Sequence, residues 1–177
     1  AQVTEIFLTT ESYLFRRTMC DLPTNALNKI FLMLHREIIR YDGTEDNYVE
    51  KFKYALLSKK ERARFPDDEE FKAAFEVRPV YLMNSKNKIY ILERFENFGT
   101  SEDKDVYRHC DDGTYSIEHI MPQHLTPIWQ KELGNDYEQI HEVWLHRMAN
   151  LTLTAYNSKY SNSSFDEKKT MQNGFDD

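Results

Sequence analysis

Apolar residues recur at helical spacing through the first hundred residues, and this periodicity limits the fold more than any other feature. In the clearest stretch, between residues 24 and 40, five of the apolar residues recur at this spacing: Leu27, Ile30, Phe31, Leu34 and Ile38. They fall every three or four residues, which places them on one face of a helix. Five glycines and five prolines in 177 residues leave few positions that favour turns or break helices. The sequence therefore predicts a mainly helical fold.

Similar spacing predicts further helices over residues 1–20, 47–57 and 80–98, and another that begins after the helix-start signal at residues 65–69. The polar, charged stretch over residues 101–113 is expected to form a loop or a boundary between subdomains. We therefore expect a helical N-terminal subdomain over residues 1–100, packed on a second unit over residues 101–177 in one compact domain.

The second unit has a different pattern, with two short strands separated by a long insert. Residues 114–121 alternate well enough to form a strand that Pro122 ends, and residues 150–154 are rich in β-forming side chains. Helical sequence follows from Asn157, and Ser164 with Glu167 forms a capping-box pattern for a last helix. The order strand, insert, strand, helix makes the predicted class α+β.

Glu118 and His119 are neighbours on the first of these strands and are the candidate catalytic pair. Neighbours on a regular strand point to opposite faces. The two side chains can serve one site only if the strand ends or is distorted at this point.

Composition limits the possible partners and the cellular compartment. The net charge of −7 argues against strong sequence-independent DNA binding by the chain alone. Cys20 and Cys110 form no Cys-x-x-Cys pair, which argues against a structural zinc site. No apolar run reaches the roughly 18 residues of a membrane span, and Glu5 and Glu11 interrupt any signal-peptide pattern. A cytoplasmic protein without a membrane partner is expected.

One motif in the second unit is specific. Glu118-His119-Ile120-x-Pro122-Gln123, followed by Asn150-Leu151-Thr152-Leu153 and Asn157, resembles the HNH-type, ββα-metal nuclease motif. The variant is that of the C-terminal domain of GmrSD-type modification-dependent restriction endonucleases. Residues 13–17 and 22–31 also resemble that family, so the resemblance covers most of the chain.

The resemblance implies a small ββα-metal unit and a divalent-metal-dependent DNA endonuclease of a restriction or phage-defence system. Its substrate would be DNA, possibly modified. Its partner would be an N-terminal, ParB-like nucleotide-hydrolysing domain. The chain has no starting Met, and we expect it to be a fragment of a larger protein.

The resemblance also implies roles for individual residues. His119 would be the general base, because imidazole can accept a proton near neutral pH. Glu118 would bind one Mg²⁺ or Mn²⁺ ion, together with a neutral oxygen from Asn157. Asn162 competes with Asn157 for this position, and either asparagine could instead be a helix cap. Asn150 would hold the loop that bears His119.

Positive side chains in the last third of the chain are candidates for contact with DNA phosphates. They are Arg147, Lys159 and Lys168, and a solvated helix face is the simpler interpretation for Lys168. The three other late histidines are expected on a polar face or at the edge of the core: His124, His141 and His146.

The sequence is also compatible with a second function. A degenerate nuclease fold could act as a catalytically inactive interaction module that docks a partner or binds nucleic acid. The net negative charge and the absence of the ParB-like domain favour this alternative. Divalent-ion binding that depends on Glu118 would count against it.

Overall fold

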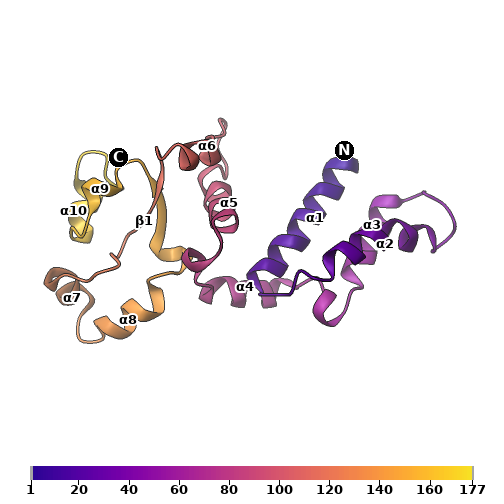
Figure 1. Cartoon of the computed structure of the whole chain (residues 1–177), viewed down its shortest axis with the longest axis horizontal. Helices are drawn as coiled ribbons and strands as arrows, with labels where there is room; N and C mark the ends of the chain where they lie inside the picture. Colours follow the sequence, from indigo (N-terminus) through magenta and orange to yellow (C-terminus); the bar gives the residue numbers. More distant parts are fainter. Residues whose placement is uncertain (1, 177) are drawn as a thin grey trace. The chain divides into compact units, whose positions relative to one another are not determined.

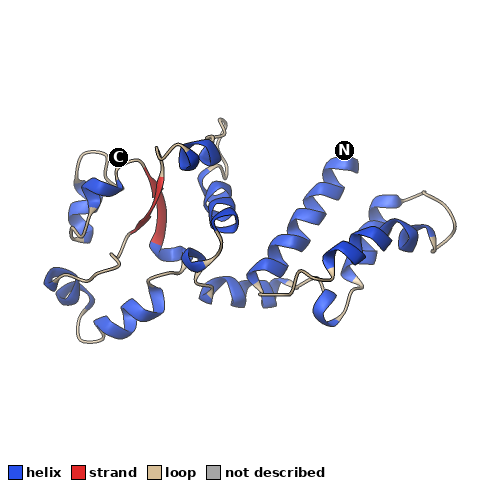
Figure 2. Ribbon diagram, in the orientation of Figure 1, coloured by secondary structure: helices blue, strands red, loops and turns tan. Residues whose placement is uncertain are grey.

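The computed structural model describes residues 2–176. Contacts divide the chain into two compact units, the first ending at Val77 and the second beginning at Arg78. Helices dominate both units, and the strands of the described residues form one two-stranded sheet (Figure 2). The predicted mainly helical α+β class is confirmed at this level.

The N-terminal unit consists of helices joined by short connections. They are α1 (Gln2–Met19), α2 (Leu27–Ile39), α3 (Tyr48–Leu57), the 3₁₀ helix η1 (Glu61–Ala63) and α4 (Asp68–Val77). Helix α3 packs against α1 and α2, and α4 packs against α1. The helices predicted from apolar spacing are therefore present in this unit.

The core of this unit forms where the predicted helix faces meet. Ile30, Leu34 and Ile38 of α2 are buried together with Tyr13 of α1 and Leu56 of α3. Burial of such apolar surface is the main stabilising contribution in a small domain. The 3–4 spacing in the sequence thus identified the buried face of α2 correctly.

The C-terminal unit contains more and shorter elements. They are η2 (Val80–Leu82), α5 (Ser85–Glu96), α6 (Val106–Asp111), β1 (Ser116–His119), α7 (Pro127–Leu133), α8 (Tyr137–Trp144), η3 (Met148–Asn150), β2 (Leu151–Thr154), α9 (Asn157–Tyr160) and α10 (Phe165–Thr170).

Two details of this unit differ from the sequence prediction. The helix expected over residues 80–98 is divided, because Asn84 caps a new helix by accepting a hydrogen bond from Asn87 N at 3.0 Å. The expected loop over residues 101–113 contains α6, which Asp105 caps through Arg108 N at 3.2 Å. Both differences arise from side-chain caps, which overrode the local pattern.

The sheet pairs β1 and β2 antiparallel, with Glu118 opposite Thr152 and His119 opposite Leu151. Helix α9 packs against β1, and α5 packs against β2 and α6. In Figure 1, α9 and α10 lie on one side of the strands, and α5 and α6 lie on the other. Because α5 packs on β2, the division between the units comes earlier in the chain than residue 100.

None of the helices within residues 2–176 is both long enough and apolar enough to span a membrane.

Candidate functional site

A pocket of about 260 Å³ lies where β1 ends and α9 begins. Its lining comes from the strand, the segment after it and the region of α9: Ile117, Glu118, His119, Pro122, Gln123, His124, Asn157, Ser161 and Asn162. Four predicted site residues therefore line the same pocket, although about forty residues of chain separate the first pair from the second.

Glu118 and His119 both line this pocket because β1 stops at His119. The sequence predicted alternation along the strand, which would place neighbours on opposite faces. Instead the two isoleucines at 117 and 120 are half-buried, whereas Glu118 and His119 are each only 4% exposed. Because the strand ends here, its alternation no longer forces the two side chains onto opposite faces.

Asn150 fixes the segment that follows His119. Its Oδ1 accepts a hydrogen bond from Met121 N at 2.7 Å, and its Nδ2 donates to Met121 O at 3.0 Å. Nδ2 also donates to Leu145 O at 3.0 Å. A buried side chain that satisfies both backbone groups of one residue holds that residue firmly.

The ring of His119 is enclosed by two other rings. Its Nε2 lies 3.4 Å from Nδ1 of His146, and the Tyr81 ring meets it edge-on with centroids 4.3 Å apart. Burial, followed by the charges of His146 and Lys168, lowers the pKa of His119 to about 4. The imidazole is therefore neutral near pH 7 and keeps a lone pair able to accept a proton.

Tyr81 and His146 are contacts of the site that sequence reasoning did not assign to it. Their rings stack at an interplanar angle of 10°, and Tyr81 N donates to His146 O at 3.1 Å. Tyr81 lies 38 residues before His119, and no local pattern relates the two positions. For His146, the one feature of the sequence that could have pointed to the site was the number of histidines in the last third of the chain.

Asn157 and Asn162 differ in how firmly they are held. Asn157 begins α9, and its Nδ2 donates to Ser116 Oγ at 3.1 Å and to Ile117 O at 3.0 Å. These bonds tie α9 to β1 and leave Oδ1 as the atom able to bind an ion. Asn162 is exposed at the rim of the same pocket.

Lys168 is not a surface cation, which corrects our expectation of a DNA contact. Its side chain is fully buried, and its Nζ lies 2.6 Å from Oε1 of Glu118. Nζ also donates to the carbonyl oxygens of His119 and Ile120, each at 3.0 Å. Burial raises the pKa of Glu118, and the ammonium group of Lys168 opposes that shift. Position 168 faces inward because it lies one helical turn after the buried cap Ser164.

The other two predicted DNA contacts lie outside the pocket lining. Lys159 is exposed on α9, with Nζ 4.8 Å from the centroid of the Tyr156 ring. Arg147 is half-buried, with its guanidinium carbon 4.7 Å from the centroid of the Trp144 ring.

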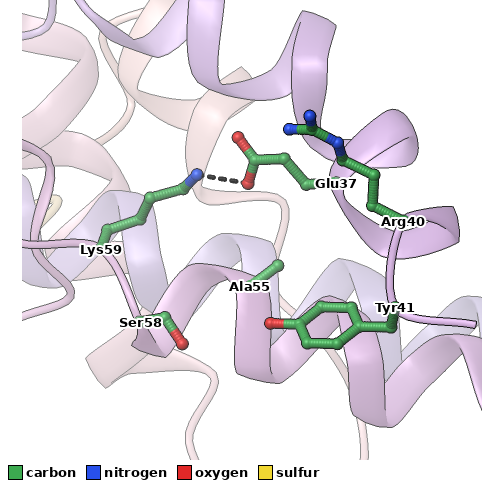
Figure 3. Close-up of a pocket in the computed structure, with 6 residues that line it drawn as sticks. All are labelled: Glu37, Arg40, Tyr41, Ala55, Ser58 and Lys59. Carbon is green, nitrogen blue, oxygen red and sulfur yellow. Dashed lines mark hydrogen bonds and ion pairs between the residues drawn. The ribbon is translucent and has the colours of Figure 1, made fainter.

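A second pocket, of about 290 Å³, lies in the N-terminal unit between the ends of α2 and α3 (Figure 3). Its only carboxylate among the lining residues, Glu37, forms an ion pair with Lys59. The lining contains no histidine or asparagine beside this carboxylate. The pocket therefore lacks the combination of a carboxylate and an imidazole that is found at the end of β1.

Within residues 2–176, no group of three or more histidine, cysteine, aspartate or glutamate side chains is arranged to hold an ion. The pocket at the end of β1 is lined by one carboxylate, from Glu118, and by three carboxamides, from Gln123, Asn157 and Asn162.

The fold and the pocket define a mainly helical α+β domain with a buried carboxylate-imidazole pair beside asparagine side chains. The sequence profile described as "GmrSD restriction endonucleases, C-terminal domain" matches residues 65–176. This is more than half of the chain, and the chain belongs to that family. No curated protein and no solved structure matches the chain.

Family membership indicates a restriction endonuclease module with DNA as its substrate. All the predicted site residues lie inside the matched range. The segments at residues 13–17 and 22–31, for which the sequence also suggested the resemblance, lie outside it.

Proposed function

We propose that this chain is a divalent-metal-dependent DNA endonuclease module whose site is an HNH-like ββα-metal unit. The observation that carries the proposal is that Glu118, His119 and Asn157 line one pocket. They are supplied by β1 and by α9, the first helix after β2. A base, a carboxylate and a carboxamide around one cavity are the groups that metal-assisted phosphodiester hydrolysis requires.

In this proposal His119 accepts a proton from the water that attacks the phosphodiester. The neutral ring has the required lone pair, and the contact with His146 engages Nε2. A pKa of about 4 makes the imidazole a weak base. A bound phosphate would raise this pKa by its negative charge, toward the range where a general base is efficient.

The donor atoms of the pocket fit Mg²⁺ or Mn²⁺, which prefer oxygen ligands. Glu118 would hold one ion together with Oδ1 of Asn157, and water and phosphate oxygens would complete its coordination. We prefer Asn157 to Asn162 because two hydrogen bonds already orient its carboxamide. The ion, when bound, would stabilise negative charge on the phosphate and the leaving oxygen.

The remaining predicted residues would orient the base or contact DNA, and the parent protein would supply a further domain. Asn150 would hold the segment after His119 and so orient the base. Arg147 and Lys159 would contact DNA phosphates. We propose that the module works in the cytoplasm on DNA, possibly modified, beside a ParB-like nucleotide-hydrolysing domain of the same parent protein.

Plasmid nicking by the intact chain tests this function. We expect nicking in Mg²⁺ or Mn²⁺, none in EDTA, and a loss of about 100-fold or more in His119→Ala, the range for removal of a general base. His35→Ala is the matched control, because it removes an exposed histidine from the N-terminal unit. Folding of each variant is checked by circular dichroism. Unchanged nicking by a folded His119→Ala variant would refute the role of His119.

The second candidate function is a catalytically inactive interaction module. The observation in its favour is the ion pair between Lys168 and Glu118, which neutralises the one carboxylate of the pocket. Titration calorimetry with Mn²⁺ separates the two functions. Heat of binding that disappears in Glu118→Ala supports the nuclease, and no binding by the unaltered chain supports the inactive module.

A further inference from the structure

We infer that Lys168 is a positioning residue of this site, holding Glu118 and the end of β1 in the arrangement that the reaction needs. The inference rests on the proposed function, in which Glu118 binds the ion. It is carried by the contacts of the Lys168 ammonium group.

These contacts use the full donor capacity of the ammonium group. A lysine ammonium group has three hydrogens, and Nζ has three acceptors: Glu118 Oε1 at 2.6 Å, and the carbonyl oxygens of His119 and Ile120 at 3.0 Å. The side chain is fully buried. No donor therefore remains for a phosphate, and the role of Lys168 has to be internal.

The first consequence concerns the orientation of Glu118. Its Oε1 accepts from the ammonium group, so Oε2 is the oxygen without a bond to Lys168 that could face an ion in the pocket. A carboxylate fixed in this way binds an ion through one oxygen in one direction. Ordering of a ligand by a neighbouring hydrogen bond is a common way in which proteins tune metal sites.

The second consequence concerns the backbone at the end of the strand. Successive carbonyl groups of a regular strand point in opposite directions because of the pleat. The carbonyls of His119 and Ile120 instead both accept from one nitrogen atom, so the regular strand cannot continue there. This is the local distortion that brings Glu118 and His119 into one pocket.

The position of the ammonium group is set by α10. Ser164 and Glu167 form a complete capping box at the start of this helix, and Lys168 follows in its first full turn. Lys169 follows it in the sequence and is exposed, with Nζ 3.6 Å from Oδ2 of Asp176. Lys169 therefore offers a control with the same charge on the same helix.

Electrostatics predict how a positioning role differs from a merely structural one. A fixed cation beside a ligand carboxylate opposes the binding of a second cation. Its removal should therefore leave Mn²⁺ affinity unchanged or increase it. Turnover should fall, because a misplaced ligand and base no longer align the attacking water.

The first test compares Lys168→Met with Lys169→Met in the intact chain. For Lys168→Met we expect nicking at saturating Mn²⁺ to fall about 100-fold, with a Kd for Mn²⁺ no weaker than that of the unaltered chain. Lys169→Met should retain both values. Wild-type nicking by folded Lys168→Met, or equal losses of nicking and Mn²⁺ affinity, would overturn the inference.

The second test does not depend on metal or DNA. Glu118→Gln and Lys168→Met each leave a buried charge without its partner, so each should lower the Tm. The double variant removes both charges and should recover most of that loss. If the Tm loss of the double variant equals the sum of the losses of the two single variants, Lys168 does not hold Glu118. The Tm of the double variant still decides the question if Lys168→Met alone does not fold. It also decides it if the chain neither binds Mn²⁺ nor nicks DNA, an outcome that would refute the proposed function and not the positioning role of Lys168.

Discussion

Burial keeps the imidazole of His119 neutral, and this has a consequence for stability that needs no substrate. His119 is 4% exposed, its ring lies beside His146, and its carbonyl oxygen accepts from the buried cation Lys168. Protonation would place another positive charge in this cluster, so the folded protein resists it. The unfolded chain has no such restriction.

The sign of the pH effect follows from the lowered pKa. As the pH falls through 6.5 the unfolded chain gains a proton at His119, whereas the folded protein gains it only near pH 4. Stability from this residue is therefore complete above pH 6.5 and is lost between pH 6.5 and about 4. That pKa difference corresponds to roughly 3 kcal/mol.

Urea unfolding in EDTA checks this prediction. Between pH 7.5 and 4 the unaltered chain should lose roughly 3 kcal/mol more of its free energy of unfolding than His119→Gln loses. His35→Gln should follow the unaltered chain. If the free energies of unfolding of the unaltered chain and of His119→Gln fall equally with pH, the ring is protonated as readily in the folded state as in the unfolded state.

At the scale of elements, the site depends on two short helices that could not persist alone. Helix α9 has four residues and α10 has six, far below the length at which isolated helices are stable in water. Asn157 bonds α9 to β1, and Lys168 bonds α10 to Glu118 and the end of β1. Side-chain bonds to the strand thus set the positions of both helices.

The capping box of α10 should contribute to this arrangement. Ser164→Ala removes the side-chain acceptor for Glu167 N, and we expect a loss of about 1 kcal/mol in the free energy of unfolding. Ser85→Ala is the matched control, because Asn84 caps α5 and Ser85 is exposed. Equal stability of the two variants in urea unfolding would show that the capping box contributes nothing.

For the whole molecule, the two compact units have separate buried residues. In the C-terminal unit these include Val80, Ile91, Leu92, Val106 and Leu151. Three of them belong to η2 and α5, the elements that precede residue 101. The C-terminal unit should therefore need residues 78–100 for its own core.

Fragments of the chain test this division. We expect residues 78–177 alone to unfold cooperatively on heating, because they retain a complete core. Residues 101–177 alone should show no cooperative transition, since they lack Ile91 and Leu92. The measurement is circular dichroism during thermal unfolding, and a cooperative transition in the shorter fragment would contradict the prediction.

The sequence by itself determined most of the helices, the two strands and the family resemblance. Apolar spacing identified the buried face of α2, the Ser164–Glu167 pattern predicted the capping box of α10, and the motif around Glu118 indicated the family whose profile matches residues 65–176. These features depend on residues close together in the chain, where spacing and side-chain type act locally.

The tertiary structure alone decided which side chains surround the candidate site. Tyr81 and His146 enclose His119, and Lys168 lies buried against Glu118 rather than on the surface. Each of these contacts joins positions 27 to 50 residues apart. A lysine on a short helix looks the same in sequence whether it faces water or a buried carboxylate, because the difference arises only when the chain packs.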